Sequence, residues 1–243
     1  MNVLIVGDIH GNLEALQEVL GDAERHGGFQ ALWCLGDIVG YGPDPGPCLD
    51  LIRGLSPVVV AGNHDRAAAG LLKLETFNSY AAEACRWTTD SLSQEQIAYL
   101  KALPLVQTQG AATLVHGSLR SPDWEYLVHE EAAVATFALL PTNHCFVGHS
   151  HVPFLCREAA SRAMFEPLIE GAPVPIDQDR VILNPGSVGQ PRDRDVRASY
   201  ALYDTDAGTV VHRRVAYDIP AIQEKMTRAG LPTPLITRLA VAQ

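Results

Sequence analysis

The sequence predicts an α/β fold, and three of its features support that prediction. Short apolar runs that stop at a glycine recur over the first 151 residues, as is typical of buried strands. Apolar residues at helical spacing separate the first of these runs, so strands and helices alternate and imply a largely parallel, covered sheet. A chain of 243 residues lies within the range of a single α/β domain, and we expect residues 1–243 to form one.

The expected strands and helices can be placed in order along the chain. A helix over residues 13–20 follows the first strand, with Asn12 as its N-terminal cap, and a second helix covers residues 49–55. Each of the five strands leads directly into a cluster of polar residues. These strands are expected at residues 3–6, 31–35, 58–61, 113–115 and 145–147.

Residues 66–107 interrupt this alternation and are expected to form a helical insertion. Because the insertion lies between two strands that lead into polar clusters, it is a candidate lid over a site. A plain packing insertion is the equally weighted alternative. Ser93 and Gln96 have the form of a capping box at the start of its last helix. The helices are expected over residues 66–74, 77–91 and 94–102.

The pattern changes after residue 151. Strand-like segments appear at residues 181–183, 199–203 and 209–215, and a turn-like segment at residues 206–208 separates the last two. These segments predict a second, mainly antiparallel sheet. The last segment, residues 220–243, begins with a helical pattern.

The charge and composition exclude several classes of protein and leave the oligomeric state open. Acidic residues outnumber basic ones by 28 to 18, so the net charge is −10, which disfavours capture of long nucleic acids or of an anionic membrane. No apolar span of about 18 residues and no basic leader is present, so we expect a cytoplasmic protein. The five widely spaced cysteines are expected to be reduced and mostly buried.

The polar clusters after the strands are rich in side chains that bind transition metals through nitrogen and oxygen. Asp8 and His10 are two residues apart where the chain leaves a strand, so both can face one ion, and His149 and His151 share this spacing. Ligand sites in α/β sheets lie beyond the carboxyl ends of the strands. One such motif alone is weak evidence, but five in order, each after a strand, strongly indicate a metal site.

In these clusters the chain resembles the calcineurin-like metallophosphoesterases. Five blocks match that family in its order, and the stretch from Asn184 to Arg192 further resembles its small bacterial phosphodiesterases. The resemblance implies a sandwich of two mixed β-sheets flanked by helices, with a dinuclear metal centre at one end. The five blocks are Asp8-Ile9-His10-Gly11-Asn12, Gly36-Asp37, Gly62-Asn63-His64-Asp65, His116-Gly117-Ser118 and Gly148-His149-Ser150-His151.

The resemblance also implies roles for individual residues. Asp37 would bridge two divalent ions. His64 would contact the phosphate or protonate the leaving group without binding a metal, and Asp65 would orient it. The first ion would be held by Asp8, His10, Asp37 and His151, and the second by Asp37, Asn63, His116 and His149.

These ligands agree with the chemistry of phosphoester hydrolysis. Only two of the seven are carboxylates, so two divalent ions leave the centre with a charge of about +2, which attracts a phosphate. Imidazole and amide ligands favour Mn, Fe or Zn over Mg or Ca. Two such ions can clamp the attacking and leaving oxygens and convert a bridging water into a metal-bound hydroxide nucleophile.

The sequence therefore predicts a metal-dependent phosphoesterase and favours a phosphodiesterase that acts on a small phosphodiester or nucleotide. A dinucleoside polyphosphate hydrolase and a phosphomonoesterase remain the alternatives. Protein phosphatases and symmetrical dinucleoside tetraphosphatases of this superfamily carry an arginine shortly after the aspartate of the second block. Here the first arginine after Asp37 is Arg53, which argues against a protein phosphatase. A non-catalytic binding scaffold is less favoured because every ligand position is filled.

Four further residues are candidates for substrate contacts. Trp124 follows His116 closely and can stack on a base, and Arg192 can bind a second phosphate. Packing under the insertion is the alternative role for Trp124, and a surface ion pair is the alternative for Arg192. The four candidates are Asn12, Arg120, Trp124 and Arg192.

Overall fold

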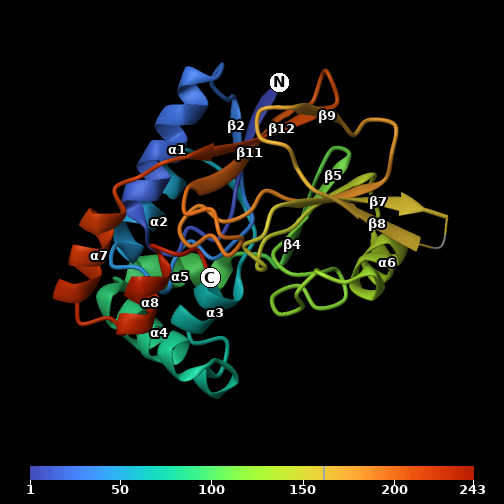
Figure 1. Cartoon of the computed structure of the whole chain (residues 1–243). Helices are drawn as coiled ribbons and strands as arrows, with labels where there is room; N and C mark the ends of the chain where they lie inside the picture. The colour runs from blue at the N-terminus through green and yellow to red at the C-terminus, as the bar shows by residue number, and fades with distance from the viewer. Residues whose placement is uncertain (161) are drawn as a thin grey trace.

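The computed structural model describes residues 1–160 and 162–243. Two six-stranded mixed β-sheets pack together, and helices lie on their outer sides (Figure 1). This arrangement confirms the α/β sandwich that the sequence and its family resemblance predict. Among the described helices, none combines the length and apolar character that a membrane crossing requires.

The first sheet joins strands from both ends of the chain in the order β3–β2–β1–β11–β12–β9. Strands β1, β2 and β3 run parallel, as the alternation of strands and helices predicts, whereas the remaining pairs are antiparallel. Its strands are β1 (Asn2–Val6), β2 (Ala31–Cys34), β3 (Val58–Val59), β9 (Pro173–Pro175), β11 (Ala198–Asp204) and β12 (Thr209–Val215).

The second sheet has the order β4–β5–β6–β10–β7–β8. Its three central strands, β5, β6 and β10, run parallel, and antiparallel strands flank them on both sides. Its strands are β4 (Val106–Gln109), β5 (Ala112–Val115), β6 (His144–Phe146), β7 (Phe154–Ala159), β8 (Arg162–Glu166) and β10 (Val181–Asn184).

One expectation about strand pairing is wrong. The three strand-like segments after residue 151 do not form a sheet of their own. Strand β10 lies between β6 and β7 in the second sheet, whereas β11 and β12 form a hairpin that extends the first. The alternation of apolar residues determines which faces of a strand are buried, but it does not determine which strand becomes its neighbour.

Two helices begin at the capping residues that the sequence predicts. The side chain of Asn12 accepts a hydrogen bond of 3.0 Å from the first turn of α1, and Ser93 and Gln96 form the capping box of α5. The helices are α1 (Leu13–Arg25), α2 (Pro45–Gly54), α3 (Asn63–Ala68), α4 (Ser79–Ser91), α5 (Gln94–Ala102), α6 (Glu130–Leu139), α7 (Ile219–Arg228) and α8 (Thr233–Arg238), with a 3₁₀ turn η1 (Leu74–Thr76).

The helical insertion expected over residues 66–107 differs from expectation in its first part and at its end, where residues 106–107 belong to β4. The helix expected over residues 66–74 is wrong, because α3 begins at Asn63 and ends at Ala68. Gly70, with a φ of 73°, turns the chain away into a loop that leads to η1. Helices α4 and α5 lie where they are expected.

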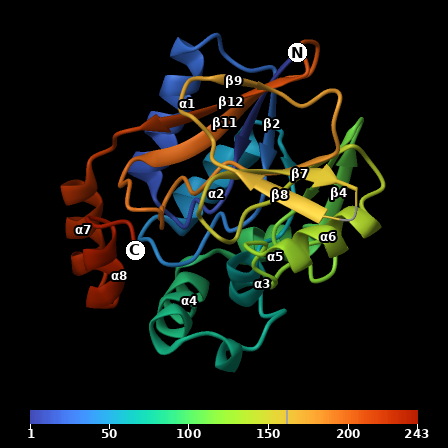
Figure 2. The same ribbon diagram turned by 45° about the vertical axis from the view of Figure 1, so that its right-hand side comes forward.

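Apolar side chains fill the space between the two sheets and the space beneath the helices. Helices α1 and α2 cover the outer face of the first sheet, and α6 covers that of the second (Figures 1 and 2). The interface between the sheets contains Ile5, Trp33, Leu114, Phe146, Leu183 and Tyr203, among others.

The two C-terminal helices pack on the insertion. Leu235 and Leu239 in and after α8 share one apolar cluster with Ala81 and Ala84 of α4 and with Tyr41. Figure 2 shows α7 and α8 next to α4. The insertion and the C-terminal helices therefore support each other on the same side of the molecule, next to the loop that carries Tyr41.

Candidate metal centre

The expected metal ligands lie where strands of both sheets end, and each is at most 5% exposed. Because β1, β2 and β3 belong to the first sheet and β5 and β6 to the second, the ligands meet at one end of the sandwich. Asp8 and His10 follow β1, Asp37 follows β2, Asn63 begins α3 after β3, His116 follows β5, and His149 and His151 follow β6.

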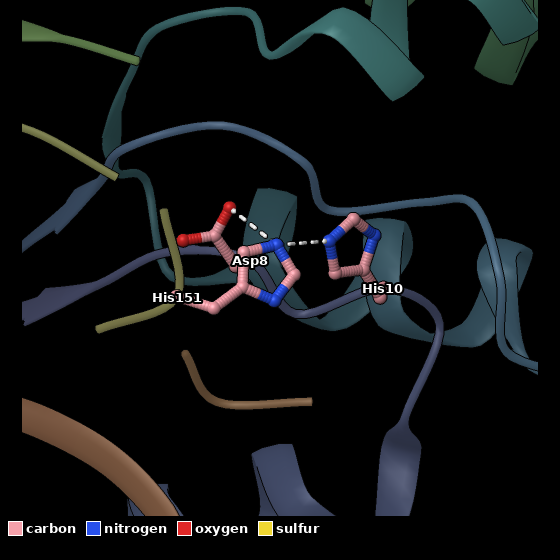
Figure 3. Close-up of side chains that lie close together, drawn as sticks. All are labelled: Asp8, His10 and His151. Carbon is pink, nitrogen blue, oxygen red and sulfur yellow. Dashed lines mark hydrogen bonds and ion pairs between the residues drawn. The ribbon is translucent and has the colours of Figure 1, made fainter. Parts of the chain in front are cut away.

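Asp8, His10 and His151 form a first group of converging ligand atoms (Figure 3). The Nε2 atom of His151 lies 3.2 Å from Nε2 of His10 and 3.5 Å from Oδ1 of Asp8. Neighbouring ligands of one tetrahedral ion, with bonds of about 2.0–2.1 Å, lie about 3.3–3.4 Å apart. The three side chains are therefore spaced as ligands of a single ion.

A second group surrounds the Nε2 atom of His116. This atom lies 3.1 Å from Oδ1 of Asn63, 3.2 Å from Nδ1 of His149 and 3.4 Å from Oδ2 of Asp37. The same Oδ2 atom lies 3.6 Å from Nε2 of His10 in the first group. Asp37 thus stands between the two groups, where a bridging ligand would stand.

Hydrogen bonds to the backbone determine which ring nitrogen of each histidine is free. A carbonyl oxygen only accepts, so the nitrogen facing it carries the proton, and the other nitrogen presents a lone pair to the site. Two lone pairs 3.2 Å apart repel each other unless a cation lies between them. The proton-bearing contacts are His10 Nδ1 to Val39 O (3.2 Å), His116 Nδ1 to Leu35 O (2.8 Å), His149 Nε2 to Trp124 O (3.1 Å) and His151 Nδ1 to Gln190 O (2.6 Å). The donor set fits divalent metal ions.

Five of these residues have a left-handed backbone, which non-glycine residues rarely adopt. Each such conformation costs about 1–3 kcal/mol and persists only where the surrounding structure enforces it. Among the described residues, half of the ten non-glycine residues with a positive φ are these candidate ligands, so the surrounding structure holds their backbone in place. The five φ angles are 53° at Asp8, 51° at His10, 52° at Asp37, 64° at His149 and 60° at His151.

The electrostatics of the site favour a bound cation. Burial lowers the pKa of His149 to about 3 and raises that of Asp8 to about 7, with a further increase from the charge of Asp37. Burial also lowers the pKa of His116, but the charge and hydrogen bond of Asp37 outweigh it and raise the value to about 10. Without a metal, His116 therefore keeps a proton beside Asp37, in the place where a cation compensates the carboxylate.

Asp65 does not hold the position that the family resemblance implies. Its carboxylate accepts hydrogen bonds from the backbone N–H groups of Asp37 at 2.7 Å, Gly62 at 3.0 Å and Val39 at 3.2 Å. These bonds hold the loop after β2, and with it Asp37, rather than the imidazole of His64. The Nδ1 atom of His64 instead lies 3.3 Å from Sγ of Cys85, which α4 supplies.

A cavity of about 230 Å³ adjoins the metal-ligand candidates. Trp124 and Arg192, two of the four substrate candidates, line it together with His64. The insertion supplies one wall through Thr76, Phe77, Asn78 and Ala81.

The other two substrate candidates lie outside the lining that the described residues form. The Arg120 guanidinium pairs with Glu125 and Glu131 at the surface. The side chain of Asn12 caps α1 and donates a hydrogen bond of 2.9 Å to the carbonyl of Gly189. Both therefore have a local structural role, and Asn12 holds the loop after β10 against the start of α1.

Sequence reasoning missed two aromatic residues of the cavity. The ring of Tyr41 lies 4.3 Å from that of His64, and the ring of Phe77 lies 5.1 Å from His64 and 5.1 Å from Trp124. Tyr41 follows the Asp37 block and stands between two glycines, which is a signal that sequence analysis can use. Phe77 lies in an irregular part of the insertion, and no local pattern marks it.

The fold and the ligand cluster identify the family of the protein. Residues 1–208 match the calcineurin-like phosphoesterase superfamily domain, and the chain belongs to this family. It is a metallophosphoesterase, a hydrolase that acts on phosphoester bonds.

Similar proteins are known from bacteria and archaea. A metallophosphoesterase from Sphaerobacter thermophilus is 44% identical, with a TM-score of 0.91 over 100% of this chain and 99% of that one. An uncharacterized protein of Methanocaldococcus jannaschii is 38% identical over 98% of this chain and 96% of its own length. The symmetrical bis(5′-nucleosyl)-tetraphosphatase of Aromatoleum aromaticum is 33% identical over 51% of this chain, which spans 46% of that enzyme.

Proposed function

We propose that this metallophosphoesterase is a phosphodiesterase for small phosphodiesters or nucleotides and works with two divalent metal ions. The observation that carries the proposal is the position of Asp37. Its Oδ2 atom lies 3.6 Å from His10 in one group of ligand atoms and 3.4 Å from His116 in the other. Two groups that share one carboxylate fit two neighbouring ions better than one.

We assign the ligands as the family resemblance implies, and Mn, Fe or Zn suits the imidazole-rich set. Two bound ions would supply Lewis acidity and an activated water. The left-handed backbone at five of the ligands and the histidine–carbonyl hydrogen bonds preorganise them. The first ion is assigned to Asp8, His10, Asp37 and His151, and the second to Asp37, Asn63, His116 and His149.

We propose that His64 contacts the transferred phosphate. Its ring lines the cavity, and burial lowers its pKa to about 4, so the imidazole is neutral near pH 7. A neutral imidazole still carries one N–H, which can donate a hydrogen bond to a phosphate oxygen or to the leaving oxygen. His64 does not need a second proton to attract the phosphate, because the neighbouring metal centre would supply the positive charge.

A preference for diesters would come from contacts to the second ester arm. Trp124 and Phe77 provide an aromatic wall of the cavity, and their ring centroids are 5.1 Å apart in an edge-to-face arrangement. Such rings bind an aryl group or a base, and stacking is worth about 1–3 kcal/mol per base. The packing of α4 on Tyr41 and α8 favours a fixed wall over a movable lid.

The names of some relatives favour one alternative within this class. The half-length match to symmetrical dinucleoside tetraphosphatases supports a dinucleoside polyphosphate as substrate. A phosphomonoesterase and a non-catalytic scaffold are the outcomes that the experiment below separates. The five free, buried thiols are typical of a reducing compartment, and we propose the cytoplasm as the site of action.

The test compares metal-loaded protein on matched phosphomonoesters, aryl phosphodiesters and dinucleoside polyphosphates. We expect a higher kcat/KM for a diester or a dinucleotide than for the matching monoester. Trp124→Ala should reduce this preference without loss of metal, and Tyr80→Ala, which removes an exposed aromatic residue outside the cavity, should leave it unchanged. The proposal is contradicted if kcat/KM for the monoesters is at least as high as for every diester and dinucleotide tested.

A further inference from the structure

Arg192 and Arg238 approach the same neutral oxygen. The Oε1 atom of Gln190 accepts a hydrogen bond of 3.0 Å from Arg192 and one of 3.2 Å from Arg238. Two guanidinium groups that share one amide oxygen repel each other, and nothing in the amide compensates their charge. Burial and the charge of Arg192 accordingly lower the pKa of Arg238.

This pair has no acidic partner within 4 Å among the described residues, although the protein carries a net charge of −10. Arg214, by contrast, forms an ion pair with Asp193, the residue that follows Arg192 in the sequence. The Nε atom of Arg192 is also buried and has no hydrogen-bond partner within the described part of the chain. Native structures rarely leave a buried donor without a hydrogen-bond partner, and an oxygen of a bound anion would supply one here.

The pair lies beside the metal centre. Arg192 lines the cavity that Asp37 and His64 also line, and Gln190 holds His151 through its backbone carbonyl at 2.6 Å. Arg238 is the last residue of α8, which lies beyond residues 1–208, the part of the chain that matches the family. The C-terminal helices therefore bring a charge to the site that the family domain itself does not contain.

We propose that Arg192 and Arg238 form a binding site for a second phosphate group of the substrate, next to the phosphate at the metal centre. Guanidinium groups bind phosphate oxygens with strong, charge-assisted and often bidentate hydrogen bonds. The inference rests on the proposed function and narrows it to substrates with two linked phosphate groups, as in a dinucleoside polyphosphate. A simple aryl diester leaves both guanidinium groups without an anionic partner.

Binding measurements test the site without relying on turnover. Calorimetry compares the Kd of metal-loaded protein for pyrophosphate, which reaches both sites, and for orthophosphate, which fills the metal centre alone. We expect Arg238→Gln to weaken pyrophosphate binding by about 10-fold or more and to change orthophosphate binding less than 2-fold. Arg228→Gln, at an exposed position on α7, is the matched control and should change neither value.

A second variant guards against misfolding of the first. Gln190→Glu has the same shape but places a carboxylate between the two arginines, so it should weaken pyrophosphate binding to a similar extent while all helix contacts stay in place. Unchanged pyrophosphate binding in both variants, or an equal loss for pyrophosphate and orthophosphate, overturns the inference.

Kinetics separate the inference from the function on which it rests. In each protein we compare kcat/KM for a dinucleoside tetraphosphate with kcat/KM for a bis-aryl phosphodiester. This ratio should be about 10-fold higher in the wild-type protein than in Arg238→Gln. An equal ratio in both proteins overturns the inference and leaves the proposed phosphodiesterase intact. A metal-loaded protein that cleaves neither substrate overturns the proposed function, and the binding comparison then decides the inference by itself.

Discussion

The Sγ atom of Cys85 lies 3.3 Å from Nδ1 of His64, so the insertion reaches the centre of the site through one thiol. Burial raises the pKa of Cys85 to about 12, which keeps it a thiol at neutral pH. The S–H group is a weak donor. When it donates to Nδ1 of His64, the single ring proton of the histidine is on Nε2.

Replacement of His64 should separate catalysis from metal binding. Since His64 is assigned no metal, His64→Ala should keep both ions and lose kcat by about 10²–10⁴-fold, the usual contribution of a positioned proton donor. Elemental analysis and steady-state kinetics on the same sample measure the two effects. Loss of an ion in this variant would show that His64 is a ligand.

Replacement of Cys85 should affect His64 through its ring proton. We expect Cys85→Ala to lower kcat by about 10-fold or less with little change in KM, because only a weak hydrogen bond is lost. Cys85→Ser should restore most of the activity, since a hydroxyl also donates. Equal activities of wild type, Cys85→Ala and Cys85→Ser contradict a positioning role for the thiol.

Asp37 should be required for both ions. Asp37→Ala removes the carboxylate that lies 3.4 Å from His116 and 3.6 Å from His10, so the protein should bind fewer than two ions. With metal present, this variant should also melt at a lower temperature than the wild-type protein, because metal binding to the native state stabilises the wild type more. Asp50→Ala, at an exposed position on α2, is the control for both measurements.

Metal uptake should release a proton at pH 8. Without metal, His116 has a pKa of about 10 and is protonated at this pH, whereas Asp8, with a pKa of about 7, is already ionised. Coordination requires neutral His116, so at least about one proton leaves and affinity rises with pH up to about 10. Calorimetry in two buffers of different ionisation enthalpy measures the proton. Identical heats in both buffers contradict the prediction.

Gly62 should tolerate no side chain. A Cβ atom at this position would overlap Oδ1 of Asp37 and its backbone nitrogen. Gly62→Ala should therefore displace the Asp37 carboxylate, with loss of metal and of at least about 100-fold in activity. Gly54→Ala is the matched control, because the space around Gly54 is open, and it should leave both unchanged. Normal metal content in Gly62→Ala contradicts this account.

The sequence could predict the candidate metal ligands because each lies within a few residues after the end of a strand. A short apolar run followed by a polar residue is a local pattern, and parallel strands bring their carboxyl ends to one edge. Asp8 and His116 both follow a strand, as the sequence predicts, although the two strands lie in different sheets. The helix caps at Asn12 and Ser93 are local as well.

Contacts between distant segments were decided only by the tertiary structure. The split of β10 from β11 and β12, the approach of Cys85 to His64 and the pairing of Arg192 with Arg238 join segments that no local pattern relates. Periodicity reports which side of an element is buried, since burial depends on the spacing of apolar residues along it. It does not report which other element covers that side, because many apolar surfaces are equivalent until the whole chain packs.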